Sequence, residues 1–128
     1  MKYFVYGILR NHERWGLRLL SPNVALKGFK MYTQSGAYPF VIFTGNKADV
    51  VYGDVVEFTS EETRDEVDAM EAGAGYHTET LNPEDYRDEP LNNGVIKIYL
   101  FPQNTETGSE FVKEITTGDW FDYRPKIS

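Results

Sequence analysis

The chain has 128 residues, of which 41% are hydrophobic and 15% aromatic, and its formal net charge is -7. This length and composition fit one hydrophobic core, so we expect a single domain over residues 1–128. The acidic balance and the lack of any cysteine argue against nucleic-acid or membrane partners, disulfides, thiolate metal sites and a cysteine nucleophile. They leave the oligomeric state open.

The apolar run within residues 1–7 is too short for a signal peptide. No segment approaches the ~20 apolar residues that cross a bilayer as a helix. Nothing in the composition demands an oxidising compartment. These features together predict a cytoplasmic protein.

Short aromatic and β-branched runs predict strands in the first half of the chain. A strand over residues 2–8 ends in a turn at Gly7, and residues 11–20 are expected to be irregular or weakly helical. Gly53 lies inside a later predicted strand, where a glycine indicates a bulge or a close approach of backbone. The other strands predicted in this half span residues 24–33, 39–44 and 49–58.

The pattern becomes helical over residues 59–72, which contain no glycine or proline. Thr59 can cap this helix, because Glu62 stands three residues later at the spacing of a capping box. The glycine-rich segment 73–75 ends the helix. Two further strands are predicted at residues 76–81 and 95–101, whereas residues 105–128 give no clear pattern.

The predicted elements are several short strands around one main helix. Strands and helices do not alternate regularly, which argues against a parallel sheet built from βαβ units. We therefore predict an α+β fold with a small mixed, mostly antiparallel and barrel-like sheet.

Glu71 is the candidate catalytic residue. It stands four residues after Val67 on the predicted helix, so its carboxylate borders the apolar stripe formed by Val67 and Met70. It also lies in the last helical turn, where the helix dipole disfavours an anion. Burial and the dipole would both raise the pKa of its carboxyl, which suits a general acid/base. The alternative is a solvated glutamate at the edge of the stripe, and other acidic residues of the helix, including Asp68, are expected to face solvent.

The segment of residues 6–10 is the candidate binding turn. Gly7 allows the chain to turn sharply after a strand and to present successive N–H groups to an anion. The alternative is an ordinary turn that ends a strand. Arg10 could attract a substrate carboxylate or could be a structural arginine. Tyr38, beside Pro39 at the entrance of a predicted strand, could stack on a ligand.

The histidines give no indication of a metal site. His12 and His77 lie in different segments and lack the spacing of paired metal ligands. Gly73 and Gly75 do not form a dinucleotide-binding motif, because they follow a predicted helix rather than open one.

In their order along the chain, these segments resemble the gamma-glutamylcyclotransferase-like family of small barrel-containing α+β enzymes. Residues 6–9 match its Tyr-Gly-Ser/Thr-Leu turn, and residues 68–76 resemble its Asp-x-x-Glu-Gly helix end followed by tyrosine. Residues 51–58 and 118–120 resemble its glycine-containing strand and its C-terminal Gly-Asp-Trp, so the resemblance spans nearly the whole chain. The sequence departs from the pattern at Ile8, where the family usually has Ser or Thr, and at Ala72, where it has Gly.

The resemblance implies an enzyme, of the transferase or lyase type, that needs no cofactor and has a small γ-glutamyl compound as its partner. The α-amine of a γ-glutamyl amine, amino acid or peptide would attack its own γ-carbonyl and release 5-oxoproline. Glu71 would remove a proton from the α-ammonium and return one to the departing nitrogen. A binding module that holds a small γ-glutamyl-like ligand without turnover is the alternative. The other residues implied to bind substrate are Tyr6, Gly7, Ile8, Leu9 and Tyr76, the first and last as pocket walls and the rest through backbone groups.

Overall fold

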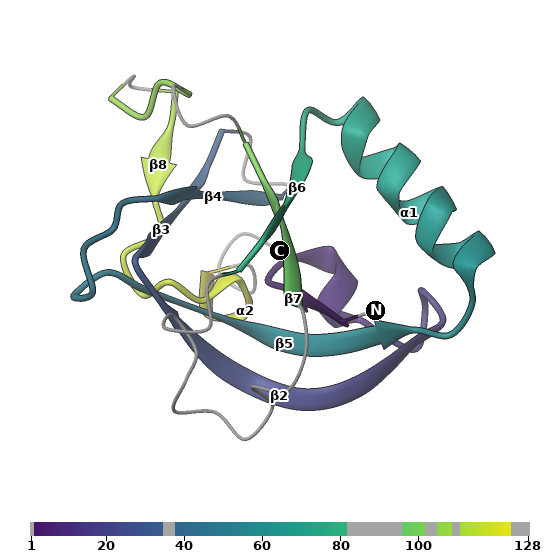
Figure 1. Ribbon diagram of the computed structural model, residues 1–128. Helices are drawn as coiled ribbons and strands as arrows, with labels where there is room; N and C mark the ends of the chain where they lie inside the picture. The colour runs from purple at the N-terminus through teal and green to yellow at the C-terminus, as the bar shows by residue number, and fades with distance from the viewer. Residues whose placement is uncertain (1, 35–37, 82–95, 102–104, 109–110, 124–128) are drawn as a thin grey trace.

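The computed structural model describes residues 2–34, 38–81, 96–101, 105–108 and 111–123. The strands of its main sheet are β1 (Lys2–Val5), β2 (Leu17–Lys27), β5 (Val50–Phe58), β6 (His77–Thr80) and β7 (Ile96–Leu100). They lie in the order β2-β5-β1-β7-β6, so β1 has a paired neighbour on each side (Figure 1). Strand β1 runs antiparallel to β5 and parallel to β7, and the remaining neighbours are antiparallel.

A second sheet of three antiparallel strands lies at the side of the molecule away from the long helix (Figure 1). Its order is β4-β3-β8, and its strands are β3 (Phe29–Thr33), β4 (Pro39–Phe43) and β8 (Lys113–Glu114). Strand β4 begins at Pro39, and the side chain of Tyr38 just before it is exposed. The second sheet therefore determines where the entrance of β4 lies.

Helix α1 (Glu61–Gly73) is the main helix. Its N-cap is Ser60, whose hydroxyl accepts a hydrogen bond from the N–H of Thr63 at 3.1 Å. The predicted cap at Thr59 is wrong by one residue, because the Thr59 hydroxyl donates to the carbonyl of Gly16 instead. No helix within the described ranges is long and apolar enough to cross a membrane. The short helical segments are η1 (Ile8–Arg10) and α2 (Trp120–Tyr123).

Strand β1 is buried on both of its faces. Phe4 packs in a hydrophobic cluster with Leu26 and Trp120, whereas Tyr3 packs in a second cluster with Val67 of α1. Successive side chains of a strand point to opposite faces, which explains why neighbouring residues of β1 belong to different clusters. The strand thus joins the layer that carries α2 to the layer that carries α1.

The predicted α+β class, with a mixed and mostly antiparallel sheet and one main helix, is confirmed. The barrel-like closure is not observed, because the described strands form an open sheet that ends at β2 and β6. The strand predicted over residues 24–33 is divided at Gly28, whose φ of 90° separates β2 from β3. The expectation of irregular or helical structure over residues 11–20 is wrong from Leu17 onward, because Leu17 already pairs with Phe58.

Gly53 marks a close approach of backbone, as its place in a predicted strand indicated. A Cβ atom on this residue would lie 2.4 Å from the carbonyl oxygen of Val5 and 2.7 Å from the ring of Phe4. Both distances are shorter than the contacts that Cβ atoms make in real proteins. Only glycine therefore lets β5 lie this close to the end of β1.

We expect Gly53→Ala to destabilise the protein by about 1–3 kcal/mol, because the added methyl group overpacks against backbone that cannot move aside. Urea unfolding would measure the difference. Gly73→Ala is the matched control, since a Cβ there meets nothing within 4 Å. Equal stability of the two variants would contradict the close approach.

Candidate active site

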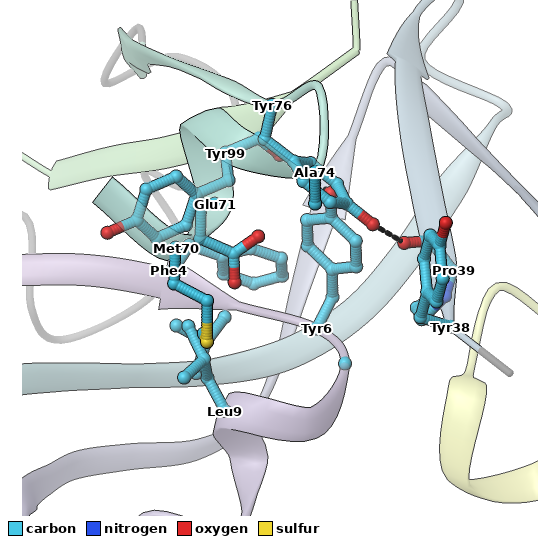
Figure 2. Close-up of a pocket in the computed structure, with 12 residues that line it drawn as sticks. Phe4, Tyr6, Leu9, Tyr38, Pro39, Met70, Glu71, Ala74, Tyr76 and Tyr99 are labelled. Carbon is cyan, nitrogen blue, oxygen red and sulfur yellow. Dashed lines mark hydrogen bonds between the residues drawn. The ribbon is translucent and has the colours of Figure 1, made fainter. Parts of the chain in front are cut away.

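Helix α1 holds Glu71 at the edge of the buried layer. Val67 is 3% exposed and packs into the core, and Glu71 follows it by one helical turn with a half-buried side chain. Figure 2 shows the Glu71 carboxylate pointing away from the helix toward Tyr6 and Leu9. The prediction that Met70 belongs to the buried face is wrong, because its side chain is 41% exposed and borders a cavity instead.

The end of α1 is fixed by hydrogen bonds to the backbone of Glu71 itself. The Glu71 carbonyl accepts from the N–H groups of Ala74 at 3.0 Å and Tyr76 at 2.9 Å. Gly75 makes this return of the chain possible, because its φ of 99° lies in the region that glycine adopts most easily. Gly75 therefore brings Tyr76 back toward Glu71, although Ala72 stands where the family has glycine.

A cavity of about 250 Å³ lies beside the Glu71 carboxylate (Figure 2). Its wall is formed by strand β1 and the turn after it, the entrance of β4, the end of α1, the residue before β6 and strand β7. Glu71 and the tyrosines are the ionisable groups among the described wall residues, and the rest are apolar or glycine. These residues are Phe4, Val5, Tyr6, Gly7, Leu9, Tyr38, Pro39, Met70, Glu71, Ala74, Tyr76 and Tyr99.

The environment raises the pKa of Glu71 to about 7. Burial of the carboxyl is the larger cause, and the negative charge of Asp68 on the same helix is the second. The direction of the pKa shift and the part played by burial agree with the expectation from the sequence, and the charge of Asp68 is a further cause that the sequence analysis did not name. A carboxyl with a pKa near 7 can both take up and give back a proton at neutral pH.

Asp68 does not face solvent as the sequence pattern predicted. Its half-buried carboxylate accepts a hydrogen bond from the hydroxyl of Tyr99 at 2.5 Å and a longer one from the hydroxyl of Tyr3 at 3.3 Å. Tyr3 comes from β1 and Tyr99 from β7, two strands that pair in parallel. The rings of Tyr3 and Tyr99 stack with their centres 5.3 Å apart, which places both hydroxyls at the same carboxylate.

The Gly7 turn lies against β4. The carbonyl of Gly7 accepts from the N–H of Arg10 at 3.0 Å and so begins the segment η1. A Cβ on Gly7 would lie 3.1 Å from the ring of Pro39, so glycine allows the turn and the entrance of β4 to meet. Leu9 is buried and lines the cavity. The side chain of Ile8 lies outside the part of the chain that is described.

Four tyrosines line the cavity, and Tyr6, Tyr38 and Tyr76 do so beside Tyr99 of β7. The Tyr6 hydroxyl donates to the carbonyl of Tyr99 at 2.6 Å, and the Tyr76 hydroxyl donates to the carbonyl of Pro39 at 2.5 Å (Figure 2). Burial raises the pKa of both hydroxyls well above their ordinary range, so they remain protonated donors. Tyr38, 39% exposed, lies at the open side of the cavity.

Arg10 is the predicted site residue that the structure places elsewhere. Its buried guanidinium donates to Asp54 at 3.3 Å, to Asp119 at 3.0 Å and to Asn23 at 2.9 Å, and it lies 4.2 Å from the centre of the Phe121 ring. These contacts occupy the side chain away from the cavity wall. The structure therefore places Arg10 outside the described cavity wall, and its contacts fit the structural arginine that the sequence analysis gave as the alternative.

Sequence reasoning missed Tyr99 as a wall residue and Asp68 as the partner of the buried tyrosines. Tyr99 lies in an apolar run that predicts a strand and carries no separate signal. The spacing of Asp68 three residues before Glu71 was available, because residues i and i+3 of a helix lie on one face. The described ranges contain no group of three or more His, Cys, Asp or Glu side chains that could hold a metal ion.

Residues 3–122 match the sequence profile of the family described as gamma-glutamyl cyclotransferase, AIG2-like. The chain belongs to this family. Among curated proteins, none matches the sequence. The family match covers the Gly7 turn, helix α1 with Glu71, and the C-terminal segment 118–120.

Solved structures from bacteria and an archaeon share the fold. The uncharacterized protein PH0828 from Pyrococcus horikoshii is 20% identical, with a TM-score of 0.71 over 99% of this chain and 95% of that one. Protein ytfP from Escherichia coli is 26% identical, with a TM-score of 0.65 over 95% of this chain and 97% of that one. YkqA from Bacillus subtilis is 23% identical, with a TM-score of 0.66, and the match covers 99% of this chain but 42% of that protein.

The raised pKa of Glu71 gives a pH-dependent stability. The folded-state pKa of about 7 lies above the ordinary value of 4.5, so ionisation of Glu71 favours the unfolded chain. This loss of stability begins near the unfolded pKa and is complete above the folded one. We expect Glu71→Gln, which does not ionise, to gain roughly 1–2 kcal/mol relative to the wild type between about pH 5 and pH 8, after allowance for solvent screening. Urea unfolding at both pH values measures this gain, and its absence would contradict the burial of the carboxylate.

Loss of the Arg10 guanidinium is expected to destabilise the fold strongly. Arg10→Ala leaves Asp54 as a buried carboxylate without its cation, which costs roughly 3–5 kcal/mol. Arg14→Ala is the control, because Arg14 is exposed and should matter little. Thermal unfolding would measure both variants. A stable Arg10→Ala protein that fails only in ligand binding would restore the substrate role.

Proposed function

We propose that this protein releases 5-oxoproline from a small γ-glutamyl amine, amino acid or peptide, with Glu71 as the general acid/base. The observation that carries the proposal is the half-buried Glu71 carboxyl, with its pKa raised to about 7, at the wall of a cavity that the Gly7 turn also lines. Membership of the gamma-glutamyl cyclotransferase, AIG2-like family supports the same reaction type.

The proposed reaction moves protons within one substrate molecule. The Glu71 carboxylate takes a proton from the α-ammonium, and the resulting amine attacks the γ-carbonyl carbon to form the new C–N bond. Glu71 then delivers a proton to the departing nitrogen as the old C–N bond breaks. The ring nitrogen of 5-oxoproline keeps one ammonium proton, and the other two leave on the released amine as its ammonium form. One group that accepts and returns a proton is enough for this sequence.

The cavity wall supports this reaction by shape more than by charge. Attack by a group of the same molecule is fast when the reacting atoms are held close together, and a small enclosed site can impose that folded conformation. The substrate α-carboxylate would rest on backbone N–H groups of the Gly7 turn, since the Arg10 guanidinium is engaged with Asp54 and Asp119. Ile8 keeps its backbone N–H, so the loss of a hydroxyl side chain there does not remove this contact.

The open side of the cavity would receive the amine half of the substrate. Tyr38 and Met70 are both more than a third exposed and both line the cavity, so they form its described rim. Neither carries a charge at neutral pH, and their aromatic and thioether surfaces suit apolar contacts. We propose that an amine half with an apolar part is accepted better than a charged one.

Glu71→Gln tests the proposed reaction. The amide cannot exchange the proton, so we expect release of 5-oxoproline to fall by roughly 10²–10⁴-fold, with the fold retained. Mass spectrometry of the product from a panel of γ-glutamyl compounds would measure it.

Glu66→Gln is the control, because Glu66 is exposed on the same helix and should leave the rate unchanged. Calorimetry with the same panel distinguishes the alternative function. Ligand binding by the wild type without any turnover would support a binding module, and full activity of Glu71→Gln would sink the catalytic assignment.

A further inference from the structure

Two carboxylates of helix α1 lie on one face in consecutive turns. Asp68 precedes Glu71 by three residues, and both side chains are half-buried between the helix and the main sheet. Such a pair is unfavourable unless one member is held by hydrogen bonds or one takes up a proton. Asp68 is the member with hydrogen-bond donors, and Glu71 lies at the cavity wall.

The donors to Asp68 come from the sheet and cannot be exchanged for solvent easily. The buried hydroxyl of Tyr99 donates at 2.5 Å, and that of Tyr3 donates at 3.3 Å. Burial, followed by the charge of Asp68, raises the pKa of Tyr3 to about 12, and burial also raises the pKa of Tyr99 above its ordinary range. Both hydroxyls therefore stay protonated at neutral pH and remain donors to the Asp68 carboxylate.

We propose that Asp68 is a positioning residue for the reaction of Glu71. Tyr99 and Tyr3 hold the Asp68 carboxylate in place, and its negative charge repels the ionised form of Glu71 each time Glu71 gives up its proton. The inference rests on the proposed function for its consequence in catalysis. The electrostatic coupling of the two carboxyls can be measured without any substrate.

The tyrosines around Glu71 are uncharged at neutral pH. Burial raises the pKa of each tyrosine that senses the charge of Glu71, so none of these hydroxyls supplies an anion at neutral pH. The half-buried Arg64, one turn before Asp68, is a cation that acts on Tyr3, and it donates to Asp65 at 3.4 Å. The titratable and charged groups near Glu71 or its neighbour Asp68 are Tyr3 from β1, Tyr6 just after β1, Tyr38 before β4, Arg64 and Asp68 from α1, Tyr76 before β6 and Tyr99 from β7.

The position of Asp68 suits an electrostatic role better than direct contact with substrate. Asp68 is not among the described residues of the cavity wall, whereas its neighbours Glu71 and Tyr99 are. Burial is the larger cause of the raised pKa of Glu71, and the charge of Asp68 adds to it from one turn away. Together they bring Glu71 toward a state that is ionised and protonated in similar amounts near pH 7. That balance is what a single acid/base needs when it serves two successive proton transfers.

The test uses Asp68→Asn, which keeps the size of the side chain and an oxygen that can accept from Tyr99. We expect the pKa of the Glu71 carboxyl, followed by NMR in the free protein, to fall by roughly half to one unit, because a like charge is removed. Asp65→Asn is the matched control, since it removes the same charge from the exposed side of α1. It should leave the Glu71 titration unchanged.

The acidic limb of the rate profile with a γ-glutamyl substrate should move to lower pH by the same amount in Asp68→Asn and stay in place in Asp65→Asn. Tyr99→Phe is a second variant that removes the hydroxyl and keeps the ring, and we expect it to move the Glu71 titration in the same direction by less. This variant keeps the inference testable if Asp68→Asn does not fold.

The outcomes separate the inference from the proposed function. A Glu71 titration that is unchanged in both Asp68→Asn and Tyr99→Phe overturns the inference, and so does an equal shift in Asp65→Asn. A shift confined to the variants at Asp68 and Tyr99, in a protein that releases no 5-oxoproline, supports the coupling and rejects the proposed function.

Discussion

The central place of strand β1 is the constraint on which the rest of the structure depends. Because β1 pairs with β5 on one side and β7 on the other, its backbone is fixed along its length, and its side chains fill two hydrophobic clusters. Its last residues lead into the Gly7 turn, and its parallel pairing with β7 brings Tyr99 beside Tyr3. Gly53 allows β5 to pass close to the end of the strand. One strand thereby positions the turn, the tyrosines and the surface on which α1 rests.

Helix α1 adds an electrostatic constraint to this scaffold. Two acidic side chains one turn apart enter a layer that would otherwise be apolar, and each avoids an unsatisfied buried charge in a different way. The carboxylate of Asp68 receives hydroxyl donors, whereas the carboxyl of Glu71 holds its proton more tightly. A cavity wall that destabilises the Glu71 anion lowers the stability of the folded protein. Such a loss of stability is common where a side chain must exchange protons.

Arg10 holds the Gly7 turn in place through contacts that lie outside the described cavity wall. The residue belongs to the segment that follows Gly7, yet its guanidinium points to Asp54 on β5 and to Asp119 just before α2. The bonds tie the turn to the main sheet and to the C-terminal segment, which supports a fixed cavity wall.

Solved structures with 20–26% identity share the fold at TM-scores of 0.65–0.71, which indicates that packing and topology rather than most side chains define it.

The sequence by itself determined the α+β class, most strands, the main helix and the place of Glu71 beside its apolar stripe, because these follow from local periodicity and from glycine positions. It also indicated the Gly7 turn and the close approach at Gly53. Only the tertiary structure decided that the described sheet stays open, that Arg10 pairs with Asp54 and Asp119, and that Asp68 is held by tyrosines from two strands. Local patterns cannot settle these points, because each depends on which residues distant in the chain become neighbours once β1 pairs with β7.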